Sequence, residues 1–165
     1  MATQTPIHPP AAIGIEVTET SYAQAPQTTI DALQTALAAE HAAVYLTGVL
    51  GAQASASRQH TLYAALLDDY REHRGRRDAL TVFISDLGGV PVAAEVSYDL
   101  PALMATAAEL NDAALQLERR IARTYGQLVE NTAGAQRRWA LVALNEVAVR
   151  QVVFRGTPEM FPGSH

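Results

Sequence analysis

The chain of 165 residues contains neither cysteine nor lysine. Without cysteine it can form no disulfide, has no thiol nucleophile and lacks the thiolate ligands of zinc fingers and iron–sulfur clusters. All twelve basic residues are arginines, and the 17 acidic residues leave a formal net charge of −5. Nucleic-acid-binding proteins usually carry a basic surplus, so this balance argues against that class. Arginines do cluster at Arg71 to Arg77 and at Arg119 to Arg123, which leaves a local basic patch open.

Long apolar runs are missing as well. A membrane-spanning helix needs about 18 to 20 consecutive apolar residues, and no run in the sequence approaches that length. A secretory signal begins with a basic segment, whereas the first basic residue is Arg58. We therefore expect a cytoplasmic protein with no membrane partner. The hydrophobic fraction of 48% and the chain length fit one domain with a sizeable core.

Apolar residues recur every three or four positions in four segments, which is the spacing of amphipathic helices. This pattern predicts helices from Thr28 or Thr29 to the serines at 55–57, from 59 to 87, from Pro101 to 131, and from 134 to 156. The expected organisation is a flexible arm over 1–28, a helical bundle over 29–157 and a tail over 158–165 that docks through Phe161. The apolar stripes of the last two helices are Leu103, Ala107, Leu110, Ala114, Leu117, Ile121 and Leu128, and then Trp139, Val142, Val149 and Val153.

The lengths of the links predict how the four helices connect. The first and last links are short, so each joins an antiparallel pair. The middle link, residues 88–100, has thirteen residues, which reach about 43 Å when extended. A helix of about 27 residues is roughly 40 Å long, so the link can cross the whole bundle. The expected fold is therefore an all-α, ferritin-like four-helix bundle with a long crossover between the second and third helices. A plain up-and-down bundle with a slack loop is the alternative.

Charged side chains fall on the apolar stripes of all four helices. They are Glu40, Asp69, His73, Arg76, Glu118 and Glu146. Each helix thus directs at least one acid toward the bundle axis near its middle. An unpaired buried carboxylate costs several kcal/mol, so these groups must meet cations or one another.

Two arrangements satisfy such acids. A dinuclear metal site takes one Glu from each of two helices and a Glu-x-x-His from each of the other two. Neither Glu-x-x-His is present, because Tyr70 precedes His73 by three positions and Val149 follows Glu146 by three. An ion-pair network is the other arrangement, and arginine suits it because its guanidinium stays charged and grips carboxylates with two N–H groups. We therefore expect a buried Arg76 bonded to Glu40, Glu118 or Glu146.

Several short motifs resemble one known family. They are Ala39-Glu40-His41-Ala42 with Tyr45 and Gly48, the segment His73-Arg74-x-Arg76-Arg77-Asp78, Glu118, Leu144-x-Glu146-x-Ala148-Val149, and Phe161-Pro162-Gly163. Over residues 30–163 the chain is similar to an actinobacterial ferritin-like domain family of unknown function. The resemblance implies a ferritin-like bundle and no particular substrate.

Two functional hypotheses follow. In the first, the bundle has no working di-iron centre and no cofactor, and acts as a structural, binding or regulatory protein. In the second, it is an atypical carboxylate-bridged iron or manganese oxidoreductase with Glu40, His73, Glu118 and Glu146 as ligands. Small residues such as Ala38, Ala42 and Ala113 allow helices to approach closely, and we expect a homodimer.

Overall fold

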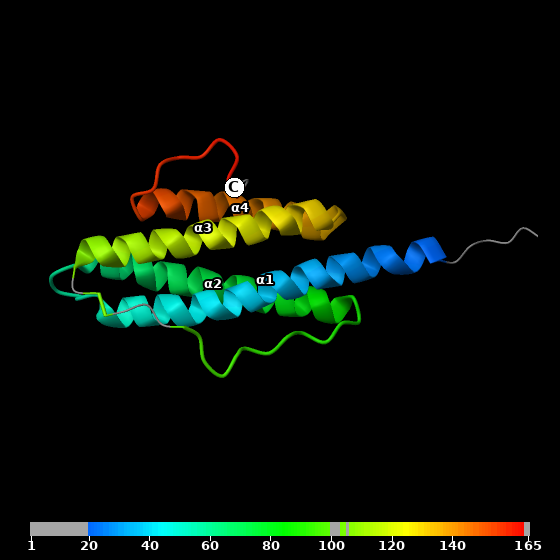
Figure 1. Cartoon of the computed structure of the whole chain (residues 1–165), viewed down its shortest axis with the longest axis horizontal. Coiled ribbons are helices and arrows are strands. Elements are labelled where there is room, and N and C mark those ends of the chain that lie inside the picture. The colour runs from blue at the N-terminus through cyan, green and yellow to red at the C-terminus, as the bar shows by residue number, and fades with distance from the viewer. Residues whose placement is uncertain (1–19, 100–102, 105, 164–165) are drawn as a thin grey trace, which may run out of the picture.

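Four helices make up the computed structural model, which describes residues 20–99, 103–104 and 106–163 (Figure 1). They are α1 (Thr20–Gln53), α2 (His60–Asp86), α3 (Ala107–Asn131) and α4 (Gly134–Val153). The described residues contain no strand, which confirms the prediction of an all-α four-helix bundle. None of these helices is long and apolar enough to cross a membrane.

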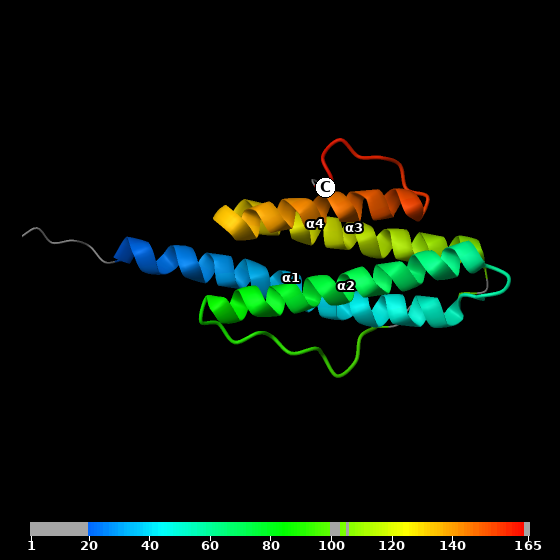
Figure 2. The same cartoon turned by 180° about the vertical axis from the view of Figure 1, so that it is seen from behind.

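The helices pair as two antiparallel hairpins, α1 with α2 and α3 with α4 (Figures 1 and 2). The helices α2 and α3 run in the same direction, so the link between them returns along the length of the bundle, as predicted. This crossover is fastened to α1 by Gln34, whose side chain donates to the carbonyl of Val90 at 2.6 Å and accepts from the amide of Val92 at 2.8 Å. His41 contacts the carbonyl of Val92 at 3.1 Å. The crossover and the C-terminal tail lie on opposite sides of the bundle.

Two helix starts differ from the prediction. The first turn of α1 is at Thr20, not at Thr28 or Thr29; the remainder of the expected arm, residues 1–19, lies outside the described residues. The third helix starts at Ala107, not near Pro101, because Thr106 caps it. The Thr106 side chain accepts from the amide of Glu109 while the Glu109 carboxylate accepts from the amide of Thr106. This reciprocal capping satisfies two backbone N–H groups that an uncapped start would leave unpaired.

The buried face of α4 is not the predicted stripe. Its buried residues are Ala140, Ala143, Val147 and Gln151. The predicted residues Val142, Val149 and Val153 are instead exposed, and Trp139 is half-buried. Small alanines let α4 lie close to α3 and leave its valines on the outer face. Because both faces of α4 are apolar, the spacing of its apolar residues did not show which one is buried.

The tail docks through its backbone. The ring of Phe161, through which docking was expected, is largely exposed. Gly163 has a φ of +80°, and a Cβ at that position would lie 2.3 Å from the carbonyl oxygen of Ala122 on α3. Only glycine accommodates both the backbone angle and the close approach.

Apolar side chains pack in two clusters along the bundle. One contains Leu33, Leu80, Ile121 and Tyr125, among others. The second contains Leu50, Leu66, Leu110 and Phe154. Along α2, the interval between Leu66 of the second cluster and Leu80 of the first is occupied on the buried face by polar residues. The bundle therefore carries a polar layer within an otherwise apolar core.

Candidate functional site

The polar layer is built on α2, which buries Asp69, His73 and Arg76 in succession. Spacings of four and three residues keep the three side chains on one helical face. Leu66 and Leu80 continue the same face on either side and are fully buried. The apolar residues of α2 thus force the polar ones between them into the core.

His73 joins carboxylates from two other helices. Its Nδ1 lies 2.7 Å from Oε2 of Glu40 on α1, and its Nε2 lies 3.0 Å from Oε1 of Glu118 on α3. None of the three side chains is exposed. The other oxygen of Glu40, Oε1, accepts a hydrogen bond of 2.8 Å from the hydroxyl of the buried Tyr125. One imidazole therefore ties α1, α2 and α3 together.

The two carboxylates set the charge of the imidazole. Burial lowers the pKa of His73, but Glu40 and Glu118 raise it by more, so the pKa lies well above 6.5. His73 is therefore protonated at neutral pH and donates from both ring nitrogens. Burial raises the pKa of Tyr125 well above 10, and the nearby Glu40 carboxylate raises it further, so the phenol remains a neutral donor.

Asp69 is the least satisfied residue of the layer. Its side chain is fully buried, yet neither carboxylate oxygen accepts a hydrogen bond from the described residues. The closest positive groups are Nε of Arg150 at 3.4 Å and Nε2 of His73 at 3.6 Å from Oδ1. Burial, and then the charge of Glu118, raise the pKa of Asp69 from 3.8 to about 7. A carboxyl group in this state loses its proton readily to any cation that binds beside it.

Two arginines fill the side of the layer that faces α4. Arg76 is nearly buried, and its Nη2 donates to Oε2 of Glu146 and to Oε2 of Glu72, both at 3.2 Å. Arg150, from α4, donates to the other oxygen of Glu72. Glu72 is 40% exposed and Glu146 56% exposed, so these pairs lie at the rim. The Nε and Nη1 atoms of Arg76 have no hydrogen-bond partner among the described residues.

The structure thus places the six predicted residues in two groups. Glu40, Asp69, His73 and Glu118 meet in the buried interior, and Arg76 lies beside them. Glu146 was expected on the buried stripe of α4 and is instead exposed, because the buried face of α4 includes Ala143 and Val147 on either side of it.

The sequence analysis did not identify Glu72 or Arg150 as members of the polar layer. Glu72 precedes Arg76 by four residues, which is the spacing of an ion pair along a helix, and that signal could have pointed to it. No local signal connects Glu72 with Arg150, because they lie 78 residues apart in the chain. His41, the neighbour of Glu40 in the chain, contacts the crossover instead of the polar layer.

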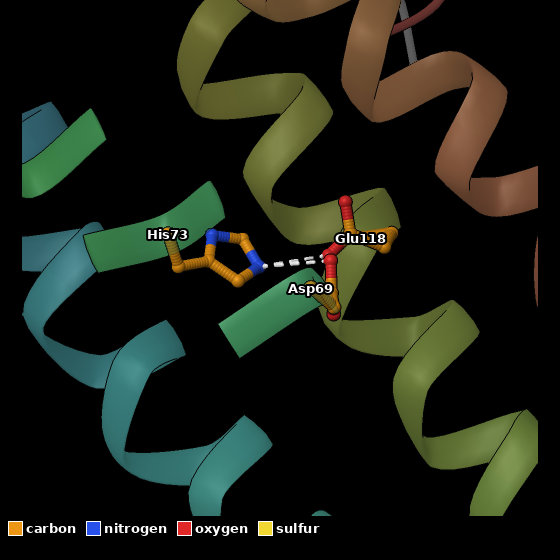
Figure 3. A group of neighbouring side chains, drawn as sticks. All are labelled: Asp69, His73 and Glu118. Carbon is orange, nitrogen blue, oxygen red and sulfur yellow. Dashed lines mark hydrogen bonds and ion pairs between the residues drawn. The ribbon is translucent and has the colours of Figure 1, made fainter. Parts of the chain in front are cut away.

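Three residues of this layer could act together as metal ligands. Asp69, His73 and Glu118 each offer one ligand atom, and these atoms all lie within 4.8 Å of one another (Figure 3). Figure 3 shows the imidazole of His73 directed at the two carboxylates, which come from α2 and α3. All three side chains are fully buried. The arrangement can hold an ion or a proton within the bundle.

Comparison with known proteins supports the same fold. A family model described as a domain of unknown function, DUF4439, matches residues 32–165. The chain belongs to this family. The DUF4439 match includes every residue of the polar layer. A crystal structure of a conserved hypothetical protein from Mycobacterium tuberculosis shares 30% sequence identity and superposes with a TM-score of 0.71. The similarity covers 78% of this chain and 96% of that one. No curated protein matches the sequence.

Proposed function

We propose that this DUF4439 protein is a ferritin-like bundle that has no working di-iron centre and acts as a non-catalytic structural, binding or regulatory protein. The observation that carries this proposal is the position of two guanidinium groups. Arg76 and Arg150 lie on the side of the buried acids that faces α4, from which a dinuclear centre would take carboxylate and imidazole ligands. Positive charge at that place repels a second metal ion.

The residues of α4 support the same conclusion. Its buried positions are taken by alanine, valine and a glutamine, and its Glu146 side chain is exposed. The second hypothesis, an iron or manganese oxidoreductase with Glu146 as a ligand, would need that carboxylate to turn inward past Arg76. These features of α4 support a bundle without a dinuclear iron centre.

Iron loading tests this proposal directly. The full-length protein, stripped of metal, is given excess Fe²⁺ without oxygen, desalted and exposed to air beside a ferritin as positive control. We expect no more than one iron per chain and no oxygen consumption above that of buffer. Two irons per chain, with oxygen consumption that Glu118→Gln abolishes, would establish the oxidoreductase instead.

The outer face of α4 supports the binding role. Leu141, Val142, Val149, Val152 and Val153 are exposed on this short helix. Apolar groups gathered in this way on a surface commonly mark protein contacts, and we propose that they form the interface of the expected homodimer. Light scattering at micromolar concentration should report two chains per particle, and Val149→Glu should shift the protein to a monomer. A wild-type monomer at that concentration would reject the homodimer.

A further inference from the structure

The buried Asp69 has two carboxylate oxygens that accept no hydrogen bond in the described structure, so it needs a partner besides the charges of Arg150 and His73. Glu118 has a similar need, because its Oε2 is buried and also lacks a hydrogen bond. Buried carboxylate oxygens are normally paired or coordinate metal ions. Two carboxylates with unpaired oxygens, both close to the imidazole of His73, therefore mark a place for a cation.

We propose that Asp69, His73 and Glu118 bind a single divalent transition-metal ion, through Nε2 of His73 and one or both oxygens of each carboxylate. This site goes beyond the proposed function, since it assigns the bundle a ligand. It rests on that function in one respect, which is that the bundle binds one ion and not two. Glu146, a ligand in the earlier alternative, takes no part.

The distances between the ligand atoms fit one ion. His73 Nε2 lies 3.0 Å from Glu118 Oε1 and 3.6 Å from Asp69 Oδ1. Two ligands that are each about 2.1 Å from a shared ion lie about 3.0 to 3.4 Å apart at octahedral or tetrahedral angles. All three ligand atoms lie within 4.8 Å of one another, so side-chain rotations can bring them onto one ion, which would replace the proton on Nε2.

The residues behind His73 are those that a metal-binding histidine requires. A ligating imidazole usually donates its other N–H to a carboxylate, which fixes its tautomer and orientation. Glu40 occupies that position at Nδ1, 2.7 Å away, and Tyr125 holds the second oxygen of Glu40. Both are positioning residues, because Glu40 contacts the ligand His73 and Tyr125 acts through Glu40. With two carboxylates and one imidazole, the ligand set suits Mn²⁺, Fe²⁺ or Zn²⁺.

Arg150 explains how Asp69 is tolerated without an ion. Its Nε lies 3.4 Å from Oδ1 of Asp69, and its side chain is 13% exposed. It borders an open groove whose walls include Glu72, Val142, Glu146 and Val149. Arg150 therefore lies between the buried Asp69 and this groove, and its charge partly neutralises Asp69 when no ion is bound.

Manganese binding to the metal-stripped, full-length protein tests the site. The electron paramagnetic resonance signal of free Mn²⁺ disappears on binding, so a titration gives both stoichiometry and affinity. We expect one ion per chain, and at least a tenfold loss of affinity in Asp69→Asn and in Glu118→Gln. Asp68→Asn is the matched control, because Asp68 is the adjacent carboxylate on α2 with a side chain 60% exposed, and its affinity should equal that of the wild type. Circular dichroism confirms that each variant is folded.

A second measurement needs no variant. Zinc titration of the ¹⁵N-labelled wild type, followed at the histidine ring nitrogens, should shift Nε2 of His73 at one equivalent and leave the surface His60 unchanged. Absence of saturable binding, equal affinity in Asp69→Asn and the wild type, or shifts confined to other histidines would overturn the inference and leave the proposed function intact. Two ions per chain, both lost in Asp69→Asn, would overturn both.

Discussion

Nδ1 of His73 and Oε2 of Glu40 lie 2.7 Å apart in a place that water does not reach. The pair connects α2 with α1, and the same imidazole connects to α3 through Glu118. Since His73 carries the positive charge between two buried carboxylates, it neutralises groups that cannot be solvated. Stability and ion binding therefore depend on the same side chain.

Replacing His73 should destabilise the bundle more than any other single change in the layer. His73→Ala leaves Glu40 and Glu118 without their cation, and breaking a buried pair in this way costs about 3 to 5 kcal/mol. Chemical denaturation measures the loss. His60→Ala, at an exposed histidine on the same helix, should change stability by less than about 0.5 kcal/mol. Equal effects of the two substitutions would show that the ion pair does not stabilise the fold.

Asp69→Asn should stabilise the metal-free protein at neutral pH. The pKa of Asp69 is raised from 3.8 to about 7 in the folded state. The protonated side chain therefore contributes its full stabilisation below pH 4, and this contribution to the free energy of unfolding is lost as the pH rises toward 7. Asparagine has no proton to lose. Between pH 4 and pH 8 the free energy of unfolding of the variant should therefore rise by on the order of 3 kcal/mol relative to that of the wild type. Urea unfolding across this range, in the presence of EDTA, measures the difference. A gap between wild type and variant that is constant with pH would contradict the raised pKa.

Arg76→Ala should cost about 2 to 4 kcal/mol, because it removes both a packed stem and a charge close to Glu40 and Glu118. Adding Glu146→Gln should recover less than about 0.5 kcal/mol. The exposed carboxylate of Glu146 is solvated with or without its partner. Arg76→Met, which keeps most of the volume, should cost less than Arg76→Ala. A full rescue by Glu146→Gln would show that this pair is desolvated in solution.

Gly163→Ala should release the C-terminal tail without unfolding the bundle. A methyl group there would approach the carbonyl of Ala122 far closer than contact distance, and the φ of +80° disfavours alanine. Hydrogen exchange should show faster exchange in the tail and unchanged exchange in α3. Gly75→Ala is the matched control, since a Cβ at that site on α2 meets nothing within 4 Å; it should raise stability by up to about 1 kcal/mol.

The sequence predicted the fold and the buried face of α2 well, for a physical reason. Leucines at 62, 66 and 80 fix the phase of that helix, so the intervening Asp69, His73 and Arg76 must share it. The same reasoning failed on α4, where alanines and valines make both faces apolar and the choice between them depends on packing against α3. The start of α3 was placed too early because proline is common in the first turn of a helix, which favoured Pro101. The reciprocal capping by Thr106 and Glu109 is the stronger signal, and the helix starts there.

The meeting of Glu72 with Arg150 could not be predicted, because it depends on how closely the two hairpins approach. The unpaired state of Asp69 could not be predicted for a similar reason. Its four-residue spacing from His73 is visible in the sequence, but its lack of a hydrogen bond appears only when the neighbours on α1, α3 and α4 are in place.

The long crossover separates the two hairpins in the chain, and residues of the polar layer lie on both. It divides the polar layer: Glu40, Asp69, His73 and Arg76 precede it, and Glu118, Tyr125, Glu146 and Arg150 follow it. Glu118 has its cation on the other hairpin, and the phenol of Tyr125 has its acceptor there. Each hairpin therefore buries polar groups whose partners lie on the other one, so neither can satisfy its own part of the layer alone.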